Sequence, residues 1–477
     1  MRLRSIQLLC FLGAGFASPV RPQAGPTIAF SHATVIEVDK GTALPGMTVV
    51  VANGRITAVG KDGSVTPPAG ARVVDATGKF LIPGLWDMHV HAAFPGVDAL
   101  FLPLLVANGI TGVREMFSRL DWVDSARVRV RRGDFPGPRM VASGHILDGT
   151  PPIWPGSVAV ATAEEARHAV DSLASAGADF IKVYSRLTPE EFFTVAREAK
   201  AKGLPFAGHV PSLVRAADAS DSGQKSVEHL TNVFTACTTM EQPFLADYAA
   251  AVRSPKAWDS AGRITRQRVG QLLAAWSPEQ CRALARHFVA NGTWMVPTIA
   301  VLHSTAYLDD STLAKDPRLQ YIPLGFKQSW DPKADFRFKM LTPEDWKNRK
   351  AVYARQLQIV TLLHTAGVKF LAGTDLSNPF IYPGFSLHDE LASLVAAGFT
   401  PAEALRAATI DPARYLGATD SLGTVAVGKL ADLVLLDANP LLDIRNTTKI
   451  AVVVADGRVY DAAAIAKMLA DGAARAK

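Results

Sequence analysis

The sequence predicts an α/β fold in which a (β/α)8, TIM-like barrel is inserted into a small β-sandwich formed by both ends of the chain. Two observations predict it. In the centre of the chain, eight short apolar runs alternate with helical stretches, as in a parallel barrel. On both sides of this part, β-branched runs carry hairpin signals, so strands from both ends can build one domain. A doubly wound open sheet is the alternative, and the number of strands favours closure.

The composite β-sandwich domain is expected over residues 25–80 and 418–465. Asn53-Gly54 in the first part and Asp456-Gly457 in the second are dipeptides typical of tight hairpin turns. The strands expected here are Thr34–Val38, Thr48–Val51, Ile56–Val59, Thr424–Val427, Asp432–Leu436 and Ile450–Val454.

The barrel is expected over residues 81–417, with insertions at 235–290 and 302–350. Its predicted strands are Leu85–Val90, Gly112–Glu115, Arg139–Ser143, Phe180–Tyr184, Pro205–His209, Ser226–Leu230, Trp294–Ala300 and Lys369–Thr374. Its predicted helices include Val97–Ala107, Ala163–Ala176, Pro189–Ala201, Pro278–Ala290 and Val352–Ala366, followed by the short helices Pro401–Ala408 and Asp411–Leu416.

The composition is that of a globular protein. The 477 residues are 48% hydrophobic and 20% charged, which excludes a disordered or fibrous chain. The 50 basic residues exceed the 44 acidic ones by only 6, and no Lys/Arg run is interleaved with aromatic residues. Nucleic acid is therefore not an expected partner. A small molecule or dipeptide is the expected substrate, and the chain is compatible with a homo-oligomer.

The N-terminus has the pattern of a secretory signal peptide over residues 1–24. Met1–Arg4 carries two arginines, the apolar run Ile6–Ala17 follows, and Gly15, Ala17 and Ala24 supply small residues for cleavage. A buried helix or an uncleaved anchor is the alternative. No later stretch has 18 uninterrupted apolar residues, so no membrane span is expected in the mature chain. We expect an exported protein, periplasmic or extracellular.

Removal of the signal peptide would leave two cysteines, Cys237 and Cys281. In an oxidising compartment two remaining cysteines favour one disulfide. Two unpaired buried thiols are the alternative. A metal role is disfavoured, because neither residue lies in a CxxC motif or beside a histidine.

Metal-ligating residue types stand at the ends of the expected strands. His89 and His91 end the first one, and residues i and i+2 of a strand point to the same side, so two imidazoles can bind one metal ion. Lys182 stands between apolar residues in the fourth strand, where a charged amine is costly unless it is paired or neutral. It is expected either to pair with an inward carboxylate or to react with carbon dioxide, forming an N6-carboxylysine that bridges two cations.

His209, His229 and Asp375 each end a further expected strand. Any one of them alone has an ordinary structural interpretation. Together with Lys182 and the first histidine pair they fall at the C-terminal mouths of strands one, four, five, six and eight, which is where barrel enzymes have their active sites. Nitrogen and oxygen ligands without a thiolate favour zinc, with manganese, cobalt or iron as alternatives.

The pattern resembles the amidohydrolase superfamily in its binuclear-metal form, and within it an exported, prolidase-like and imidazolonepropionase-like branch. The resemblance extends over residues 27–461. The residues that carry it are Pro83–His91, Lys182, His209, His229, Ala372–Asp375, Ala404–Leu416 and Gly428–Val434.

The resemblance implies a catalytic role for this set. The histidine pair of strand one and Asp375 would hold a more buried metal ion, and His209 and His229 a more exposed one. Carboxylated Lys182 and a hydroxide would bridge the two ions. Asp375 would take the proton of the hydroxide and deliver it to the leaving nitrogen. Tyr184 would donate a hydrogen bond to the developing oxyanion or to a substrate carboxylate; the alternative is a core aromatic residue.

Three further residues are candidates for substrate contacts. Arg114 could pair with a substrate carboxylate, as peptidases of this type need, or could form a structural ion pair. His145 and Trp154 lie in the apolar loop after the third strand, where they could line a pocket for an acyl group or side chain. Trp154 could also simply pack on the barrel rim.

The predicted function is that of an exported, metal-dependent amidohydrolase that cleaves the C–N bond of dipeptides or N-acyl amino acids. A lactone, carbamate or phosphoester hydrolase with the same site is one alternative. A non-catalytic exported binding protein is another, and the complete ligand set argues against it.

Overall fold

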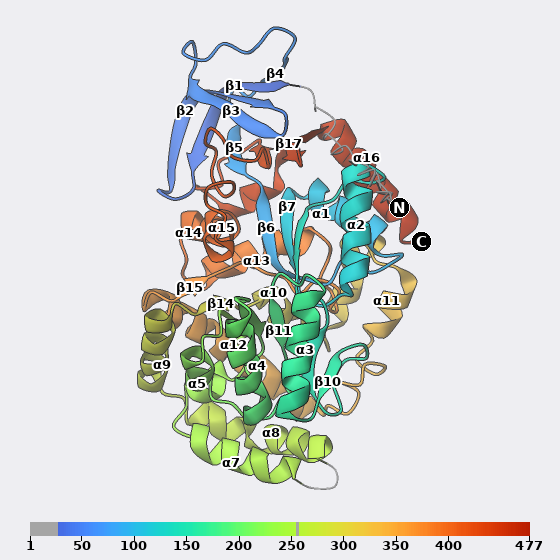
Figure 1. Cartoon of the computed structure of the whole chain (residues 1–477), viewed down its shortest axis with the longest axis vertical. Coiled ribbons are helices and arrows are strands. Elements are labelled where there is room, and N and C mark those ends of the chain that lie inside the picture. The colour runs from blue at the N-terminus through green and yellow to red at the C-terminus, as the bar shows by residue number, and fades with distance from the viewer. Residues whose placement is uncertain (1–26, 254–256) are drawn as a thin grey trace, which may run out of the picture.

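The computed structural model describes residues 27–253 and 257–477. A parallel barrel forms the body of the molecule, and a β-domain made of early and late strands covers one end of it (Figure 1). The predicted signal peptide, residues 1–24, lies outside the described residues. Within residues 27–253 and 257–477, no helix has the length and apolar character needed to cross a membrane.

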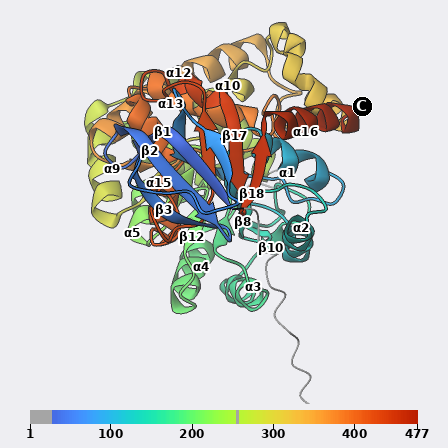
Figure 2. The same ribbon diagram turned by 90° about the horizontal axis from the view of Figure 1, so that it is seen from above.

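The β-domain joins the two ends of the chain in one sheet. Its order is β18-β17-β16-β5-β1-β2-β3, with β4 paired to β1, and Figure 2 shows β1–β3 beside β17 and β18. The junction is the antiparallel pairing of β16 with β5, which sets Val434 opposite Ile82. These strands are β1 (Ile28–Glu37), β2 (Thr42–Ala52), β3 (Arg55–Lys61), β4 (Arg72–Asp75), β5 (Phe80–Pro83), β16 (Leu433–Leu436), β17 (Ile450–Ala455) and β18 (Arg458–Asp461).

All eight predicted barrel strands are present among the described residues, most of them shorter than expected. They are β6 (Leu85–Val90), β7 (Ile110–Glu115), β8 (Arg139–Ala142), β11 (Ile181–Val183), β12 (Phe206–Gly208), β13 (Ser226–Glu228), β14 (Trp294–Val296) and β15 (Lys369–Phe370). The barrel is closed between its last and first strands, because the Met88 amide donates to the Ala372 carbonyl at 2.9 Å. The predicted α/β barrel with a β-sandwich from both chain ends is thus confirmed.

Amphipathic helices surround the barrel. In α4, Thr188 caps the N-terminus in a capping box with Glu191, and the buried face includes Phe192 and Val195. The surrounding helices are α1 (Asp98–Ala107), α2 (Leu120–Arg132), α3 (Ala163–Ser175), α4 (Pro189–Ala201), α5 (Ala216–Asp221), α9 (Pro278–Asn291), α12 (Pro343–Thr365), α13 (Phe385–Ala396), α14 (Pro401–Ala407) and α15 (Ile410–Leu416).

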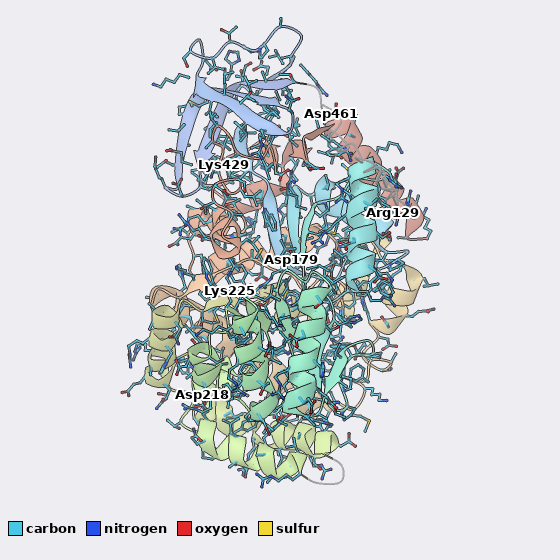
Figure 3. All side chains as sticks on the ribbon, viewed as in Figure 1. Arg129, Asp179, Asp218, Lys225, Lys429 and Asp461 are labelled. Carbon is cyan, nitrogen blue, oxygen red and sulfur yellow. A yellow bond between two sulfur atoms is a disulfide. The ribbon has the colours of Figure 1, made fainter. Side chains whose placement is uncertain are left out.

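Three of these helices, α2, α5 and α13, are absent from the sequence prediction, and so is a helix after β18 that packs on this layer. On α2, Arg129 pairs with Asp98 of α1 at 2.6 Å and lies on the outer side of the barrel (Figure 3). After β18, α16 (Ala462–Arg475) packs Ile465 and Met468 against Val106 of α1.

The two predicted insertions contain further helices. They are α6 (Val233–Ala236), α7 (Glu241–Val252) and α8 (Ala257–Ala274) in the first, and α10 (Ile299–Ala306), α11 (Leu324–Ser329) and the 3-10 turns η1 (Ser311–Lys315) and η2 (Pro317–Tyr321) around the second; η3 (Ile444–Thr448) precedes β17.

Several predicted boundaries are wrong. Thr424–Val427 is a bend rather than a strand, because Gly423 and Gly428 on either side adopt left-handed φ angles of 87°. The seventh barrel strand ends at Val296, since Thr298 also has a positive φ and α10 follows. The helix expected from Val352 begins at Pro343, where Thr342 and Asp345 form a capping box.

The prediction of a loop after the third barrel strand is also partly wrong. It contains β9 (Ile146–Gly149), which pairs in parallel with β11, and β10 (Val158–Val160), which pairs with β9. The segment between them carries Trp154 and is therefore fixed at both ends to the barrel sheet.

Cys237 and Cys281 form a disulfide with a Cα–Cα distance of 4.3 Å. Both residues are fully buried. The bond joins the end of α6 to α9 and closes a loop with a sequence separation of 44 residues. It therefore anchors the first insertion to the barrel helices.

Replacing both cysteines by alanine is expected to lower the free energy of unfolding by about 3–4 kcal/mol, the chain-entropy contribution of a loop of this length. Denaturant unfolding without reductant measures the change. Cys281→Ala alone should lose nearly as much, because either replacement breaks the bond. Equal unfolding midpoints for the wild type and both variants would contradict the prediction.

Candidate active site

The histidine pair of β6 lies at the C-terminal mouth of the barrel. His89 is 1% exposed, and its Nδ1 donates to Glu228 Oε2 at 2.7 Å. This hydrogen bond fixes the tautomer, so the lone pair of His89 is on Nε2. The ring of His91 lies 5.4 Å from that of His89. His89 lies in β6 and His91 directly follows this strand, so both imidazoles come from one strand end, as the sequence predicts, with their rings close together.

Lys182 reaches the same point from β11. Its side chain is buried, and its Nζ lies 3.5 Å from His89 Nε2. Burial lowers the pKa of Lys182 to about 8, although the charges of Glu228 and Asp375 oppose this effect. A buried amine with a lowered pKa is more often neutral, and the neutral form is the one that can form a carbamate.

His209 follows β12 directly. Gly208 precedes it at a φ of 136°, and a Cβ on this glycine would lie 2.1 Å from the Val183 carbonyl oxygen, so only glycine lets β12 approach β11 this closely. His209 Nδ1 is 2.7 Å from Ser185 Oγ, whereas its buried Nε2 has no hydrogen-bond partner among the described residues. Such a lone polar atom requires an explanation, and a bound metal ion supplies one.

His229 ends β13 with a positive φ of 57°. Thr298 donates its hydroxyl to the Pro297 carbonyl at 2.7 Å, so its oxygen accepts the Nδ1–H of His229 at 2.6 Å. The lone pair of His229 is therefore on Nε2. Its ring lies 4.5 Å from that of His89 and 5.0 Å from that of His209.

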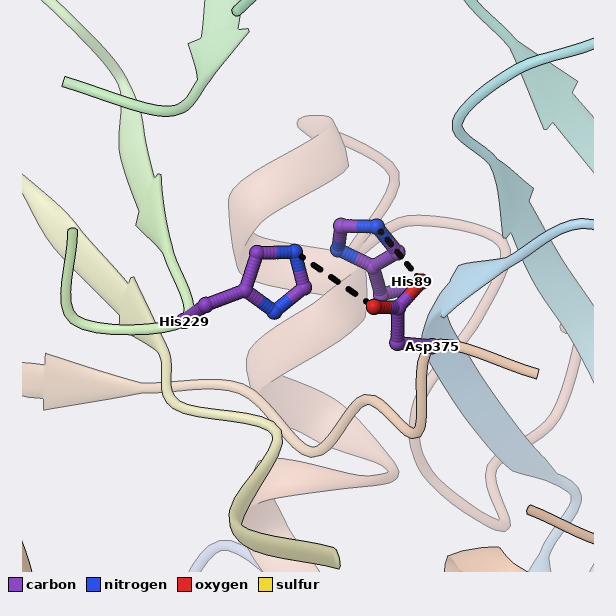
Figure 4. A group of neighbouring side chains, drawn as sticks. All are labelled: His89, His229 and Asp375. Atoms are coloured by element: carbon purple, nitrogen blue, oxygen red, sulfur yellow. Dashed lines mark ion pairs between the residues drawn. The ribbon is translucent and has the colours of Figure 1, made fainter. Parts of the chain in front are cut away.

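Asp375 closes the group from the chain after β15. Its Oδ1 lies 3.5 Å from His89 Nε2, and its Oδ2 lies 3.7 Å from His229 Nε2 (Figure 4). The same Oδ1 lies 3.1 Å from His91 Nε2. Gly373 lets this segment pass β6, because a Cβ there would lie 3.0 Å from the His89 amide nitrogen. Asp375 has a positive φ of 61°, which turns the chain sharply at the site.

The protonation states suit a cation. Burial lowers the pKa values of His89 and His209 well below the usual range, and that of His229 to about 4, so these imidazoles are neutral and can act as ligands. Burial opposes ionisation of Asp375, but neighbouring His229, His91 and Lys182 outweigh it and lower its pKa to about 2.

His91 differs from the other three histidines. Burial disfavours its charged form, but hydrogen bonds and charge from Asp375 and Glu115 outweigh this effect and raise its pKa to about 9. Two carboxylates therefore attract positive charge to this point. Ligand atoms of His89, His229 and Asp375 all lie within 4.8 Å of one another. The residues fit a metal ion, and the group is a His/His/Asp metal site.

The metal site forms the floor of a cavity of about 760 Å³. Its walls are mainly apolar, which is typical of a pocket for a small organic molecule. The wall residues include Phe94, Phe117, Trp154, Val301, Leu302, Phe326, Trp330 and Phe336, together with the polar Thr305, Ser377, Asn378 and Arg337.

Tyr184 and Trp154 meet in this cavity. Trp154 Nε1 donates to Tyr184 Oη at 2.8 Å, and the Tyr184 ring lies 3.9 Å from the ring of His209. Because its oxygen accepts from the indole, the Tyr184 hydroxyl hydrogen is free to point elsewhere. Burial raises the pKa of Tyr184, so the hydroxyl remains a hydrogen-bond donor.

The other two substrate candidates do not reach the cavity. Arg114 is fully buried below the site, where its Nη2 pairs with Glu228 Oε1 at 2.8 Å and its Nη1 donates to Tyr415 Oη at 2.8 Å. Of the two predictions for Arg114, the structural ion pair is thus correct and the contact with substrate is wrong. His145 donates from Nδ1 to the Gly156 carbonyl at 2.7 Å and is not part of the cavity wall, so its predicted substrate contact is wrong too.

Sequence reasoning missed the residues that orient the ligands. Glu228 is fully buried and bonds both His89 and Arg114. Its position directly before His229 in a barrel strand is the signal that could have identified it. Ser185 and Thr298, which orient the other imidazoles, carry no such signal, because common hydroxyl residues in loops have many roles.

The sequence comparisons give short local matches. The amidohydrolase family model matches residues 290–460. The chain is 36% identical over 102 residues to an adenine deaminase of Ruegeria pomeroyi and 39% identical over 86 residues to an imidazolonepropionase of Anaeromyxobacter dehalogenans. These matches cover 18% and 17% of this chain, and only 17% and 20% of the relatives' own lengths.

The structural comparisons extend over nearly the whole chain. A protein of Bifidobacterium longum described as a prolidase has a TM-score of 0.64 and 26% identity, covering 94% of this chain and 99% of its own. A bottromycin amidohydrolase has a TM-score of 0.71 at 24% identity, covering 94% and 90%. A Xaa-Pro dipeptidase with bound methionine has a TM-score of 0.65 at 20% identity, covering 91% and 100%. The chain is thus similar to amidohydrolases: their family model matches part of it, its His/His/Asp metal site is typical of them, and its structural neighbours are prolidase-like.

Proposed function

We propose that the protein hydrolyses the C–N bond of dipeptides or N-acyl amino acids at a site that binds two divalent metal ions. The observation that carries this proposal is the convergence of six metal-ligating side chains on the floor of one apolar cavity. Prolidase-like neighbours support the choice of bond and substrate, since two of them are described as a prolidase and a Xaa-Pro dipeptidase.

The proposed ligands divide into two groups. The histidine pair of β6 and Asp375 would hold one ion, and His209 and His229 the other. Lys182, as an N6-carboxylysine, would supply two oxygens between them. Nitrogen and oxygen donors of this kind suit zinc, and also manganese, cobalt or iron. Bound ions would lower the pKa of a water molecule and polarise the scissile carbonyl group.

The chain's own residues perform the proton transfer. Asp375, ionised and within 4 Å of three imidazoles, accepts the proton of the attacking water at its carboxylate and delivers it to the leaving nitrogen. His91, whose Nε2 faces Asp375 at 3.1 Å and whose Nδ1 faces Glu115 at 3.7 Å, would share the ion with this carboxylate and so keep it in place during the transfer.

Tyr184 stabilises the transition state in this proposal. Its hydroxyl, held by Trp154, donates to the oxygen on which negative charge develops. The aromatic walls of the cavity exclude water, which strengthens this hydrogen bond. They also match an apolar side chain or acyl group on the substrate.

We further propose that the protein is exported to the periplasm or the extracellular space. The charged and apolar pattern of residues 1–24 supports export. So does the buried disulfide between Cys237 and Cys281, because disulfides persist in oxidising compartments. N-terminal sequencing of the mature protein from the native host tests this proposal, and an intact Met1 in a cytoplasmic fraction would refute it.

Replacing Asp375 by alanine is expected to lower the bound divalent metal and to reduce kcat by at least about 10³-fold, because one side chain is both ligand and proton carrier. Elemental analysis should give two ions per wild-type chain, and assays with a panel of dipeptides and N-acyl amino acids measure turnover. Asp389→Asn on α13, an exposed carboxylate away from the cavity, is the matched control. Full activity of Asp375→Ala would contradict the assignment.

Tyr184→Phe is expected to lower kcat by about 10²-fold with little change in metal content, because it removes one oxyanion donor and no ligand. Trp154→Phe should lower kcat by a smaller factor, since it removes the indole N–H that orients the Tyr184 hydroxyl and leaves the hydroxyl itself in place. Steady-state kinetics on the best substrate of the panel gives both values. A larger loss for Trp154→Phe than for Tyr184→Phe would show that the tyrosine is not the donor.

A further inference from the structure

Arg337 stands in the wall of the cavity and takes part in no step described above. It belongs to the insertion between β14 and β15, and it lines the cavity with Trp154 and Asn378. Among the described lining residues, Arg337 and Lys182 are the Lys and Arg side chains, and Lys182 is at the metal site. Arg337 is therefore the guanidinium that a substrate meets in this cavity.

Three contacts fix this guanidinium. Its Nη2 and Nε bond the Asp335 carboxylate at 2.6 and 3.1 Å, and its Nη1 donates to Asn378 Oδ1 at 2.9 Å. Its Cζ lies 5.3 Å from the centre of the Trp154 ring, a cation–π distance. A guanidinium has five N–H donors, and these bonds use one hydrogen on each nitrogen. One N–H on each terminal nitrogen is left for a ligand, which allows bidentate binding of a carboxylate.

The guanidinium is also linked to the reacting groups. Trp154, on which it stacks, donates to Tyr184 Oη at 2.8 Å. Asn378, to which it donates, bonds the Asp375 carbonyl through Nδ2 at 3.1 Å. Trp154 thus connects Arg337 to Tyr184, the proposed oxyanion donor, and Asn378 connects it to Asp375, the proposed proton carrier. Arg337 and the metal-site residues line the same cavity, so one substrate in it can contact both.

A second guanidinium lies near Arg337. Arg349 of α12 has its Cζ 4.9 Å from the centre of the Phe338 ring, and Arg337 lies 5.0 Å from that ring. Arg349 interacts with Asp335 and Asp345, and its charge and that of Arg337 repel each other. An anion bound at Arg337 would relieve this repulsion.

We propose that Arg337 binds the free carboxylate of the substrate and so selects amino-acid derivatives with an ionised carboxylate beside the scissile amide. This specificity rests on the proposed function, because it assumes that the cavity is the substrate site. Asp335, Asn378 and Trp154 position the guanidinium and do not themselves contact the anion. Arg114 cannot bind this carboxylate, because it is buried below the metal site. Arg337, which belongs to the insertion between β14 and β15, takes that role.

Calorimetric titration with 2-benzyl-4-oxopentanoate, which is N-acetylphenylalanine with CH2 in place of the scissile nitrogen, and with the carboxamide of the same ketone tests the proposal without turnover. The wild type should bind the carboxylate at least tenfold more tightly than the amide, and Arg337→Met should bind the two equally. Arg337→Lys should keep part of the preference, because it retains the charge without the planar pair of donors. Arg355→Met is the matched control, since Arg355 also stacks on a tryptophan, Trp276, which does not line the cavity.

A second variant distinguishes the loss of carboxylate binding by Arg337 from repulsion of the carboxylate by Asp335. Arg337→Met leaves Asp335 without its partner, and this carboxylate alone could repel an anion. The double variant Asp335→Asn/Arg337→Met removes both charges. It should still bind carboxylate and amide equally. A restored carboxylate preference in the double variant, or an undiminished preference in Arg337→Met, would overturn the proposal, as would a wild type without preference.

Different results would refute the proposed hydrolysis and the proposed role of Arg337. A wild type that prefers the carboxylate through Arg337 but hydrolyses no dipeptide or N-acyl amino acid would refute the proposed function and retain the anion site. A wild type that hydrolyses these substrates, with a ratio of KM values for free acid and amide unaffected by Arg337→Met, would retain the function and refute the role of Arg337.

Discussion

Burial of charge in the barrel mouth is the constraint on which this structure depends. His89, Lys182 and Glu228 are at most 1% exposed, so each must have a partner or lose its charge. Arg114 neutralises Glu228, whose second oxygen takes the Nδ1–H of His89. The Nε2 lone pair of His89 and the Lys182 amine then face Asp375. A divalent cation is the partner whose charge and coordination suit such a set.

The backbone around the site is shaped for the same purpose. His229, Thr298 and Asp375 all have positive φ angles, which non-glycine residues adopt at a cost. Gly208 and Gly373 are places where a Cβ would collide with the neighbouring strand or with the β6 backbone. Strained turns and close contacts of this kind concentrate at functional sites, and here they bring the ends of β12, β13 and β15 to one side of the cavity.

The sequence predicts the barrel well because its signal is local. Apolar runs mark all eight strands, and Thr188 with Pro189 marks the start of α4. Lys182 and the strand-end histidines are predictable because parallel strands end at a common rim. Partners across the barrel are not predictable in this way. The sequence leaves a substrate role and a structural ion pair open for Arg114, because its counter-charge, Glu228, lies 114 residues away in the sequence.

The insertions are the least predictable part. The start of α12 at Pro343, for example, precedes the expected start by nine residues. The contribution of Phe336 and Arg337 to the cavity wall follows from packing against Trp154, which comes from a different loop. No local pattern encodes such a contact. The ends of the barrel strands thus carry the proposed catalytic residues. Segments without a strong sequence signal form the part of the cavity wall that would contact the substrate.

The most direct test of the central claim is a crystal structure of the zinc-loaded protein with anomalous data at the zinc edge. The account predicts two anomalous peaks among the imidazoles of His89, His91, His209 and His229 and the Asp375 carboxylate, with planar density extending from Lys182 Nζ toward both. Absence of bound zinc there, or peaks at other side chains with a bare Lys182 amine, would contradict it.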